Sequence, residues 1–206
     1  MMSYKAAISN LPHGGAKAVI MKPKVIKDRT ALLHAFGDFV NELGGRYITA
    51  MDSGTSESDM DIIAERTKFV TCTSASGSGG DPSPITAFGV CRGIEASVKY
   101  KLKRNDLQGV HVTIQGAGHV GYYLAKELHQ RGARMTMCDI NAKALERCVN
   151  EFGVSVCSVD DIYDIEADVF APCALGSILN LRTIQRLKVK IVAGSANNQL
   201  AHQHYG

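Results

Sequence analysis

Three residues near the start of the chain carry side chains suited to proton transfer and anion binding. Lys17 follows two glycines and an alanine and enters an apolar segment. A partly buried lysine loses its charge readily and can act as an acid or a base near neutral pH. Asp52 follows the strand-like segment 47–50, and an acid at a strand end is often catalytic. Lys5 could pair with a substrate carboxylate.

Each of these residues also has a purely structural interpretation. Lys5 falls in a strand-like segment, SYKAAIS, where a lysine is usually solvated at a sheet edge. Asp52 stands beside Gly54 and could simply form a turn. Lys17 could flank a strand without a chemical role. The combination, rather than any single residue, favours a site.

A glycine-rich motif near the middle of the chain predicts a nucleotide-binding turn. Residues 116–121 read GAGHVG and match the GxGxxG pattern between a β-rich strand pattern and a helical stripe. Gly116 allows a tight turn, and Gly118 lets the backbone approach a pyrophosphate. Gly121 lets the helix pack closely on the strand. The alternative is a structural glycine turn that binds nothing.

The predicted helix begins within this motif, so the N–H groups around His119 and Val120 can face phosphates. Asp139 ends the next predicted strand, 23 positions after Gly116. A carboxylate there can accept hydrogen bonds from both ribose hydroxyls and would repel a 2′-phosphate. The motif therefore favours NAD over NADP.

The elements that must position these residues alternate between strand and helix. A Ser/Gly/Pro-rich loop at 74–84 separates two series, and Ser56 with Asp59 forms a capping box before a short helix. The predicted strands are 17–21, 47–50, 69–72, 112–116, 134–139, 168–173 and 190–195. The predicted helices cover 28–43, 59–65 and 85–100, and three more follow, ending near residues 129, 152 and 187. This alternation predicts an α/β protein with a mostly parallel sheet covered on both faces.

Bulk composition narrows the function classes. The chain has 206 residues, of which 45% are hydrophobic and 21% charged, with a formal charge of +3 and no basic block. These values argue against nucleic acid or an anionic membrane as a partner. We find no secretory signal pattern and expect a cytoplasmic protein with reduced cysteines. The spacing of His, Cys and Asp suggests no metal site.

Several longer motifs resemble the glutamate/leucine/phenylalanine/valine dehydrogenase family, and most of all its leucine-acting members. The GxGxxG turn is the least specific of them. The motifs that carry the resemblance lie at 4–7, 14–17, 45–50 with Asp52, 82–87, 116–121, 170–176 and 193–200. The resemblance covers essentially the whole chain.

The resemblance implies reversible, NAD-dependent oxidative deamination of a branched-chain L-amino acid, with leucine preferred, to a 2-oxo acid and ammonia. By position, Lys5 would hold the substrate carboxylate, Lys17 would be the catalytic lysine, and Asp52 would be its acid–base partner. In the family a lysine of this kind activates water on the imino carbon, and the aspartate moves protons to and from the amino group.

The resemblance also implies contacts to the cofactor and substrate from the second half of the chain. Thr86 would bond the nicotinamide carboxamide, and Ala174 would line the cofactor. Asn197 would line the nicotinamide, and Asn198 the substrate. The implied architecture is a partial substrate lobe at 1–80, followed by a Rossmann-type, doubly wound NAD-binding domain at 81–206 that is incomplete at its C-terminal end.

Length leaves alternatives open, because family members extend beyond both ends of this chain. The alternatives are a catalytically inactive dinucleotide-binding fragment or subunit, or an enzyme for phenylalanine or valine. A glutamate-specific enzyme is less favoured, because no extra cation stands ready for a side-chain carboxylate. Uncovered sheet edges and helix faces would favour a homo-oligomer or a complementing chain.

Overall fold

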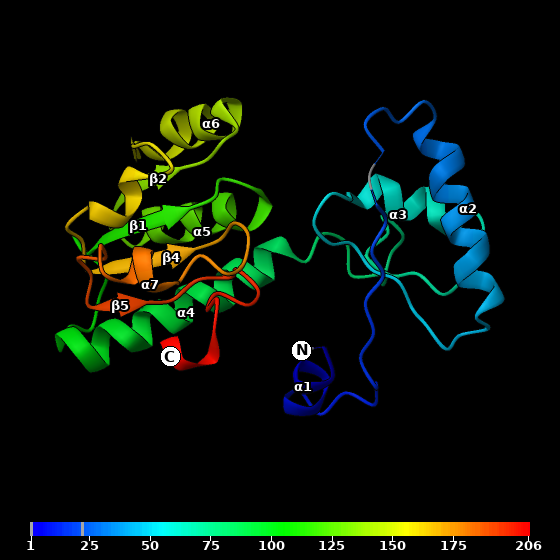
Figure 1. Ribbon diagram of the computed structural model, residues 1–206, viewed down its shortest axis with the longest axis horizontal. Coiled ribbons are helices and arrows are strands. Elements are labelled where there is room, and N and C mark those ends of the chain that lie inside the picture. Colours follow the sequence, from blue (N-terminus) through cyan, green and yellow to red (C-terminus); the bar gives the residue numbers. More distant parts are fainter. Residues whose placement is uncertain (1, 22) are drawn as a thin grey trace. The chain divides into compact units, whose positions relative to one another are not determined.

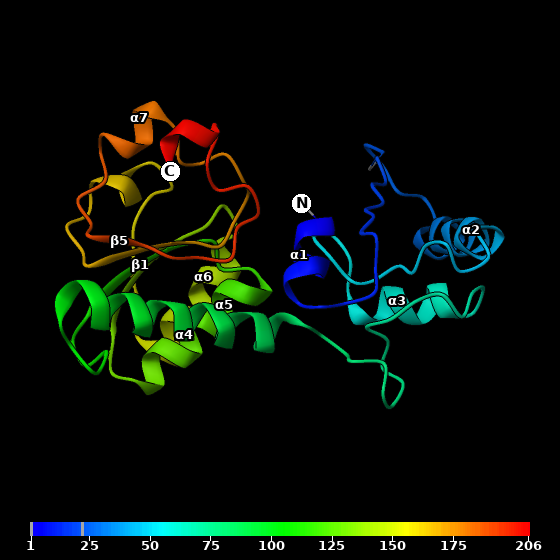
Figure 2. The same ribbon diagram turned by 90° about the horizontal axis from the view of Figure 1, so that it is seen from below.

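The computed structural model describes residues 2–21 and 23–206 of the chain (Figure 1). The chain forms two compact units, Met1–Pro82 and Ser83–Gly206. Among its described residues, the first unit contains three helices, α1 (Met2–Ile8), α2 (Arg29–Glu42) and α3 (Glu57–Ala64). The second contains a sheet with helices on both faces (Figure 2).

The helices of the first unit begin where their capping residues predict. Asp28 accepts a hydrogen bond from the Ala31 N–H and starts α2. The predicted capping box before α3 is confirmed, because Ser56 and Asp59 each accept from the other's backbone N–H. A small buried cluster then joins the two helices. Its fully buried members are Leu33, Met60 and Ile63.

The strands predicted for this unit are largely wrong. Residues 17–21 adopt no regular structure, and Val19 and Met21 are more than four-fifths exposed, at 83% and 89%. An extended segment becomes a strand only when a neighbour pairs with it, and sequence alternation alone cannot supply one. Segments 47–50 and 69–72 meet in one parallel bridge, Thr49 to Val70.

Lys5 also lies in a different element from the one predicted. The segment around it forms α1 rather than a strand. Alanine and lysine are strong helix formers, and the two alanines after Lys5 outweigh the short apolar–polar alternation. Ala6 is the buried residue of this helix.

The second unit is built on a five-stranded, all-parallel sheet in the order β3-β2-β1-β4-β5. This order is that of a doubly wound α/β sheet, so the predicted fold class is confirmed. Its strands are β1 (His111–Gln115), β2 (Arg134–Cys138), β3 (Ser155–Val156), β4 (Val169–Pro172) and β5 (Ile191–Val192). Its helices are α4 (Ser83–Leu102), α5 (His119–Gln130), α6 (Ala142–Phe152) and α7 (Leu181–Ile184), with 3₁₀ turns η1 (Asp161–Asp164) and η2 (Gln203–Tyr205).

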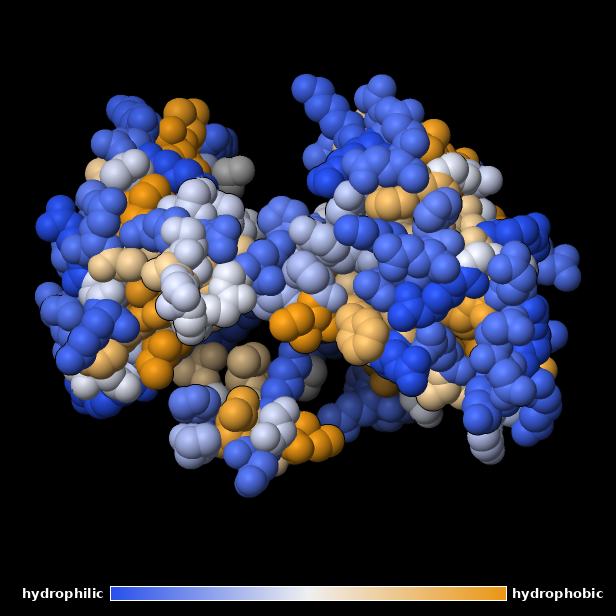
Figure 3. Space-filling view, turned by 180° about the vertical axis from the view of Figure 1, so that it is seen from behind, coloured by the Kyte–Doolittle hydropathy of each residue, from blue (hydrophilic) through white to orange (hydrophobic). Residues whose placement is uncertain are grey.

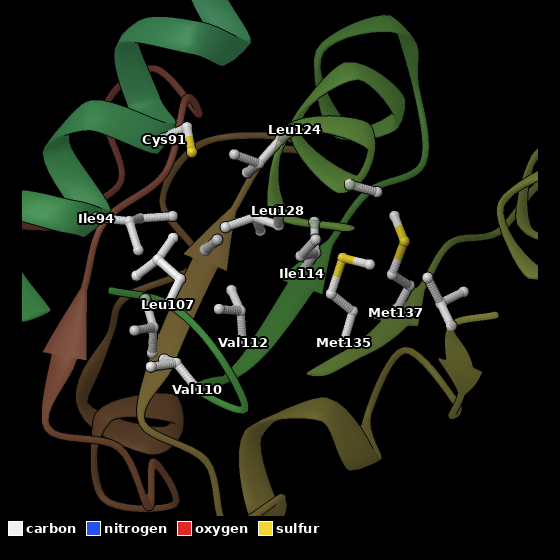
Figure 4. Packing of buried hydrophobic residues seen from close by; sticks show 14 of the residues in the cluster. Cys91, Ile94, Leu107, Val110, Val112, Ile114, Leu124, Leu128, Met135 and Met137 are labelled. Carbon is white, nitrogen blue, oxygen red and sulfur yellow. The ribbon is translucent and has the colours of Figure 1, made fainter. Parts of the chain in front are cut away.

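Two buried clusters cover the two faces of this sheet, and Figure 2 shows α4, α5 and α6 on one face and α7 on the other. On one face α4, α5 and α6 pack against residues such as Val112, Ile114 and Met137 (Figure 4). On the other face η1 and the segments around α7 pack on Cys138 and Phe170. Strand alternation divides the side chains between the faces.

The register of the sheet aligns the ends of its strands. Gln115 of β1 is opposite both Cys138 of β2 and Pro172 of β4. The residues that follow these three strands therefore emerge together at the carboxyl edge. That edge is where open α/β sheets bind ligands.

On the face of the molecule shown in Figure 3, hydrophilic residues predominate and hydrophobic ones form small separate groups. Within the described residues, no helix combines the length and apolar character needed to cross a bilayer.

Candidate active-site residues

The ammonium of Lys17 forms an ion pair with the carboxylate of Asp52, although 35 positions separate them in the sequence. Each side chain is half exposed, at 50% and 49%. The other carboxylate oxygen of Asp52 accepts from the Ser53 N–H at 2.7 Å. The carboxylate is thereby fixed in orientation, with one oxygen left for the lysine.

Lys5 is close enough to influence Lys17. The pKa of the Lys17 ammonium lies below its ordinary value, first because of partial burial and second because of the positive charge of Lys5. Gly15 makes this approach possible. Its φ is +79°, and a Cβ there would lie 2.3 Å from the Ser3 nitrogen. The loop before Lys17 therefore packs directly on α1.

A second ion pair, not predicted from the sequence, holds the turn that carries Asp52. Arg29, the first residue of α2, donates to both carboxylate oxygens of Asp59 at 2.7 and 2.8 Å. Its guanidinium also donates to the Gly54 carbonyl at 2.9 Å. The Arg29 hydrogen bonds hold the pKa of Asp59 down at about 2. The capping-box pattern identifies Asp59 in the sequence, but no sequence pattern predicts its ion pair with Arg29.

In the second unit, residues 116–121 connect the end of β1 to the first residues of α5 and are named here the glycine turn. The φ of Gly116 is +107°, and a Cβ there would meet the Ala174 nitrogen at 2.9 Å. A Cβ on Gly121 would lie 2.0 Å from the Gly116 carbonyl oxygen, so this glycine allows the helix to pack on the turn. Gly118 differs, because a Cβ there would meet nothing within 4 Å.

The space beside Gly118 coincides with the start of α5. Gly118 is the N-cap of this 12-residue helix and provides no side-chain cap for its first N–H groups. His119 is exposed there, and Val120 is partly buried. Unsatisfied first-turn amides beside a residue without a side chain suit a phosphate. The residues present therefore fit a dinucleotide.

Asp139 directly follows β2 and reaches the glycine turn. One carboxylate oxygen accepts from the Ala117 N–H at 2.6 Å, and the other accepts from the Asn141 N–H at 2.8 Å. The carboxylate is therefore held at the carboxyl edge, beside the turn.

Two further loops that leave the same edge carry Ala174 and the two candidate asparagines. Ala174 follows β4 and contacts the turn at Gly116. Asn197 and Asn198 follow β5, and their carbonyl oxygens would lie 2.4 and 3.0 Å from a Cβ on Gly176. All three predicted residues are exposed.

Thr86 lies in the first turn of α4 and is exposed. Its neighbour Ala87 is buried in the same cluster as Ala117 of the glycine turn. The structure thus groups the predicted residues by unit. Lys5, Lys17 and Asp52 cluster in the first unit, while the glycine turn, Asp139, Ala174 and the asparagines share one sheet edge.

Comparison with known proteins gives the class of this chain. Residues 1–69 match the Glu/Leu/Phe/Val dehydrogenase dimerisation domain, and residues 77–147 match the Glutamate/Leucine/Phenylalanine/Valine dehydrogenase model. The chain is 50% identical to leucine dehydrogenase of Thermoactinomyces intermedius over 206 residues, and 42% identical to valine dehydrogenase of Streptomyces virginiae over 210. The crystal structure of L-tryptophan dehydrogenase from Nostoc punctiforme superimposes with a TM-score of 0.71 at 40% identity, covering 98% of this chain.

These relatives are all amino-acid dehydrogenases, which defines the class. The chain belongs to the glutamate/leucine/phenylalanine/valine dehydrogenase family. It spans 56% of the length of the Thermoactinomyces leucine dehydrogenase and 57% of that of the Nostoc tryptophan dehydrogenase structure.

Proposed function

We propose that this protein carries out NAD-dependent oxidative deamination of a branched-chain L-amino acid, preferentially leucine, to a 2-oxo acid and ammonia. The observation that carries the proposal is the Lys17–Asp52 ion pair, with Lys5 close enough to lower the pKa of Lys17. We assign the first unit to substrate chemistry and the second to the cofactor, with the boundary near residues 80–82.

The first unit supplies the groups for proton transfer. Lys5 would bind the substrate carboxylate as a cation. Asp52 would take a proton from the substrate amino group, since its carboxylate is oriented by Ser53 and the lysine. Lys17, with its lowered pKa, would in its neutral form activate the water that attacks the imino carbon. In its charged form Lys17 would stabilise the developing oxygen charge.

The second unit would hold NAD, which supplies the hydride acceptor when bound. The first-turn amides of α5, at His119 and Val120, would receive the pyrophosphate beside Gly118. Asp139 would accept from the ribose hydroxyls and disfavour a 2′-phosphate. Thr86, Ala174 and Asn197 would line the nicotinamide end, and Asn198 the substrate.

Leucine is the favoured substrate because this chain is more similar in sequence to a leucine dehydrogenase than to the valine and tryptophan dehydrogenases. Leucine dehydrogenase of Thermoactinomyces intermedius is 50% identical to this chain, against 42% for the Streptomyces valine dehydrogenase. Tryptophan dehydrogenase of Nostoc punctiforme is 41% identical. Phenylalanine and valine remain the alternative substrates.

We further infer that the protein acts in a homo-oligomer or with a complementing chain. The first unit matches a model described as a dimerisation domain. Its segment before α2 exposes large apolar side chains, which a partner would cover. These are Ile8, Leu11, Val19, Ile20, Met21 and Val25.

A second candidate function is a dinucleotide-binding subunit without turnover, which the fit of the glycine turn and Asp139 to a dinucleotide would support by itself. The test is NADH formation from NAD with L-leucine, L-isoleucine, L-valine, L-phenylalanine and L-glutamate at mildly alkaline pH. We expect the fastest rate with leucine, one 2-oxo acid and one ammonia per NADH, and loss of the rate in Asp52→Asn. Saturable NAD binding with no turnover by the folded protein would establish the second candidate instead.

A further inference from the structure

Two cysteines lie side by side at the ends of neighbouring strands at one edge of the sheet. Cys138 is the last residue of β2, and Cys157 directly follows β3. The two strands are parallel with Met137 opposite Val156, and the Cys157 N–H donates to the Met137 carbonyl at 3.1 Å. The register continued by one residue places Cys157 opposite Cys138.

Both thiols also face the same side of the sheet. Cys138 belongs to the buried cluster formed with Phe170, and Cys157 packs against that cluster. After burial, which has the largest effect, each thiol is close enough to influence the pKa of the other, and the Cys157 thiol donates to the Met137 carbonyl at 3.8 Å. Neighbouring strands are about 4.8 Å apart, within the Cα separation of about 4.4–6.8 Å that disulfides require.

The two cysteines differ in access. Cys138 is completely buried, whereas Cys157 is partly exposed. Strand β3 is an edge strand of two residues, both exposed, so small adjustments there disturb little packing. An external reagent would therefore reach Cys157 first, with Cys138 behind it.

We propose that Cys138 and Cys157 form a redox-active dithiol that closes to a disulfide in the presence of a low-molecular-weight disulfide. The Cys157 thiolate attacks one sulfur of the reagent RSSR and releases RS⁻, giving a mixed disulfide. Cys138 then loses its proton and attacks the Cys157 sulfur, which releases the second RS⁻. The protein thiols lose two electrons, RSSR gains them, and two RSH are formed.

The disulfide would link the edge strand β3 covalently to β2 and would close a loop that contains α6. Burial raises the pKa of both thiols, that of Cys138 to about 12, so the reaction is slow at neutral pH. Asp139 follows Cys138 directly and holds the Ala117 N–H of the glycine turn. The disulfide would thus form next to the nucleotide-binding edge.

The test treats the folded, full chain with oxidised glutathione and maps disulfides by mass spectrometry. Trypsin gives a peptide of residues 135–143 that contains Cys138 alone, and cleavage after Glu151 and Glu166 isolates Cys157. We expect these peptides to be linked, and the melting temperature to rise by about 5 °C. Oxidised, folded protein in which these peptides stay separate would overturn the proposal.

Phenylarsine oxide gives an independent test, because trivalent arsenic binds two close thiols without any oxidation. The folded wild type should bind one equivalent, with loss of the thiol reactivity of Cys157. Cys157→Ser should bind none, while Cys72→Ser, which removes another partly exposed thiol, should bind like the wild type. Binding that survives in Cys157→Ser would contradict the pairing.

Discussion

The carboxylate of Asp139 accepts a hydrogen bond from the Ala117 N–H at 2.6 Å, which joins the end of β2 to the glycine turn. The two residues are 22 positions apart, and the parallel register of β1 and β2 brings them to one edge. The same carboxylate would meet the ribose of a bound dinucleotide. This contact therefore links the architecture of the sheet to cofactor choice.

Replacing Asp139 by asparagine tests that link. The Asp139→Asn side chain keeps one oxygen for the Ala117 N–H but loses the charge. We expect NAD binding to weaken about tenfold, since a hydrogen bond to a charged group contributes about 1.5–3 kcal/mol, and discrimination against NADP to fall. Calorimetric titration with both cofactors measures this. Glu146→Gln, at an exposed position on α6, loses the same charge and should bind like the wild type.

Two glycine substitutions should separate cofactor binding from folding. In Gly118→Ala the added methyl enters space with no atom within 4 Å, so we expect normal stability and at least about tenfold weaker NAD binding, equivalent to about 1.4 kcal/mol. In Gly121→Ala the methyl would lie 2.0 Å from the Gly116 oxygen, and we expect a loss of about 1–3 kcal/mol of stability. Urea unfolding measures the stability of both variants, and titration measures their affinity for NAD. If both variants lost the same stability, Gly118 and Gly121 would not have the separate roles in binding and folding that we assign to them.

The Arg29–Asp59 pair should stabilise the first unit in a pH-dependent way. The folded pKa of Asp59 is about 2 against an ordinary value of 3.8, so this stabilisation is complete above pH 4 and is lost as the pH falls toward 2. The difference corresponds to about 2 kcal/mol. Asp59→Asn should therefore be about 2 kcal/mol less stable at pH 7, with a smaller deficit near pH 2.

Hydrogen exchange of the α2 and α3 amides measures this loss in the unit concerned. Asp38→Asn, at an exposed position on α2, removes the same charge and serves as the control. A deficit for Asp59→Asn that does not change between pH 7 and pH 2 would show that the ion pair is not its source.

Lys5 should set part of the pKa of Lys17. Its positive charge is the second cause of the lowered value, after burial. We expect Lys5→Met to raise the pKa of Lys17, whereas Lys5→Arg, which keeps the charge, should leave it low. The pH dependence of Lys17 labelling by an amine-specific reagent reports this pKa without requiring turnover. If the labelling profile of Lys17 were unchanged in Lys5→Met, Lys5 would not contribute to the pKa of Lys17.

The second unit could be predicted from sequence because its signals are local. Strands β1, β2 and β4 are short apolar runs, each followed by a helix, and they pair with one another in the regular parallel sheet. The strand missed, β3, has two exposed residues and therefore no apolar pattern. In the first unit the apolar runs at 17–21 and 47–50 suggested strands, but strand formation depends on partners that the local pattern does not specify.

Some features of the candidate site can likewise be predicted from local sequence, and others depend on tertiary structure. The glycine turn was recognisable from spacing, because each glycine has its own backbone or packing requirement. The Arg29–Asp59 pair and the Cys138–Cys157 pair were not, because the members of each pair come from separate elements that only tertiary structure brings together. The sequence marks Lys17 and Asp52 as separate candidates, and only the folded unit brings them together as an ion pair.

The most direct test of the proposed chemistry compares two lysines of the first unit. Lys17 pairs with Asp52, whereas Lys24 lies in the same unit at an exposed position. The measurement is the initial rate of NADH formation from L-leucine and NAD for Lys17→Ala and Lys24→Ala, each shown to be folded and to bind NAD. We predict that Lys17→Ala lowers the rate of NADH formation by about 10²–10⁴-fold and that Lys24→Ala keeps a rate near that of the wild type. Equal rates in the two variants would contradict a catalytic role for Lys17.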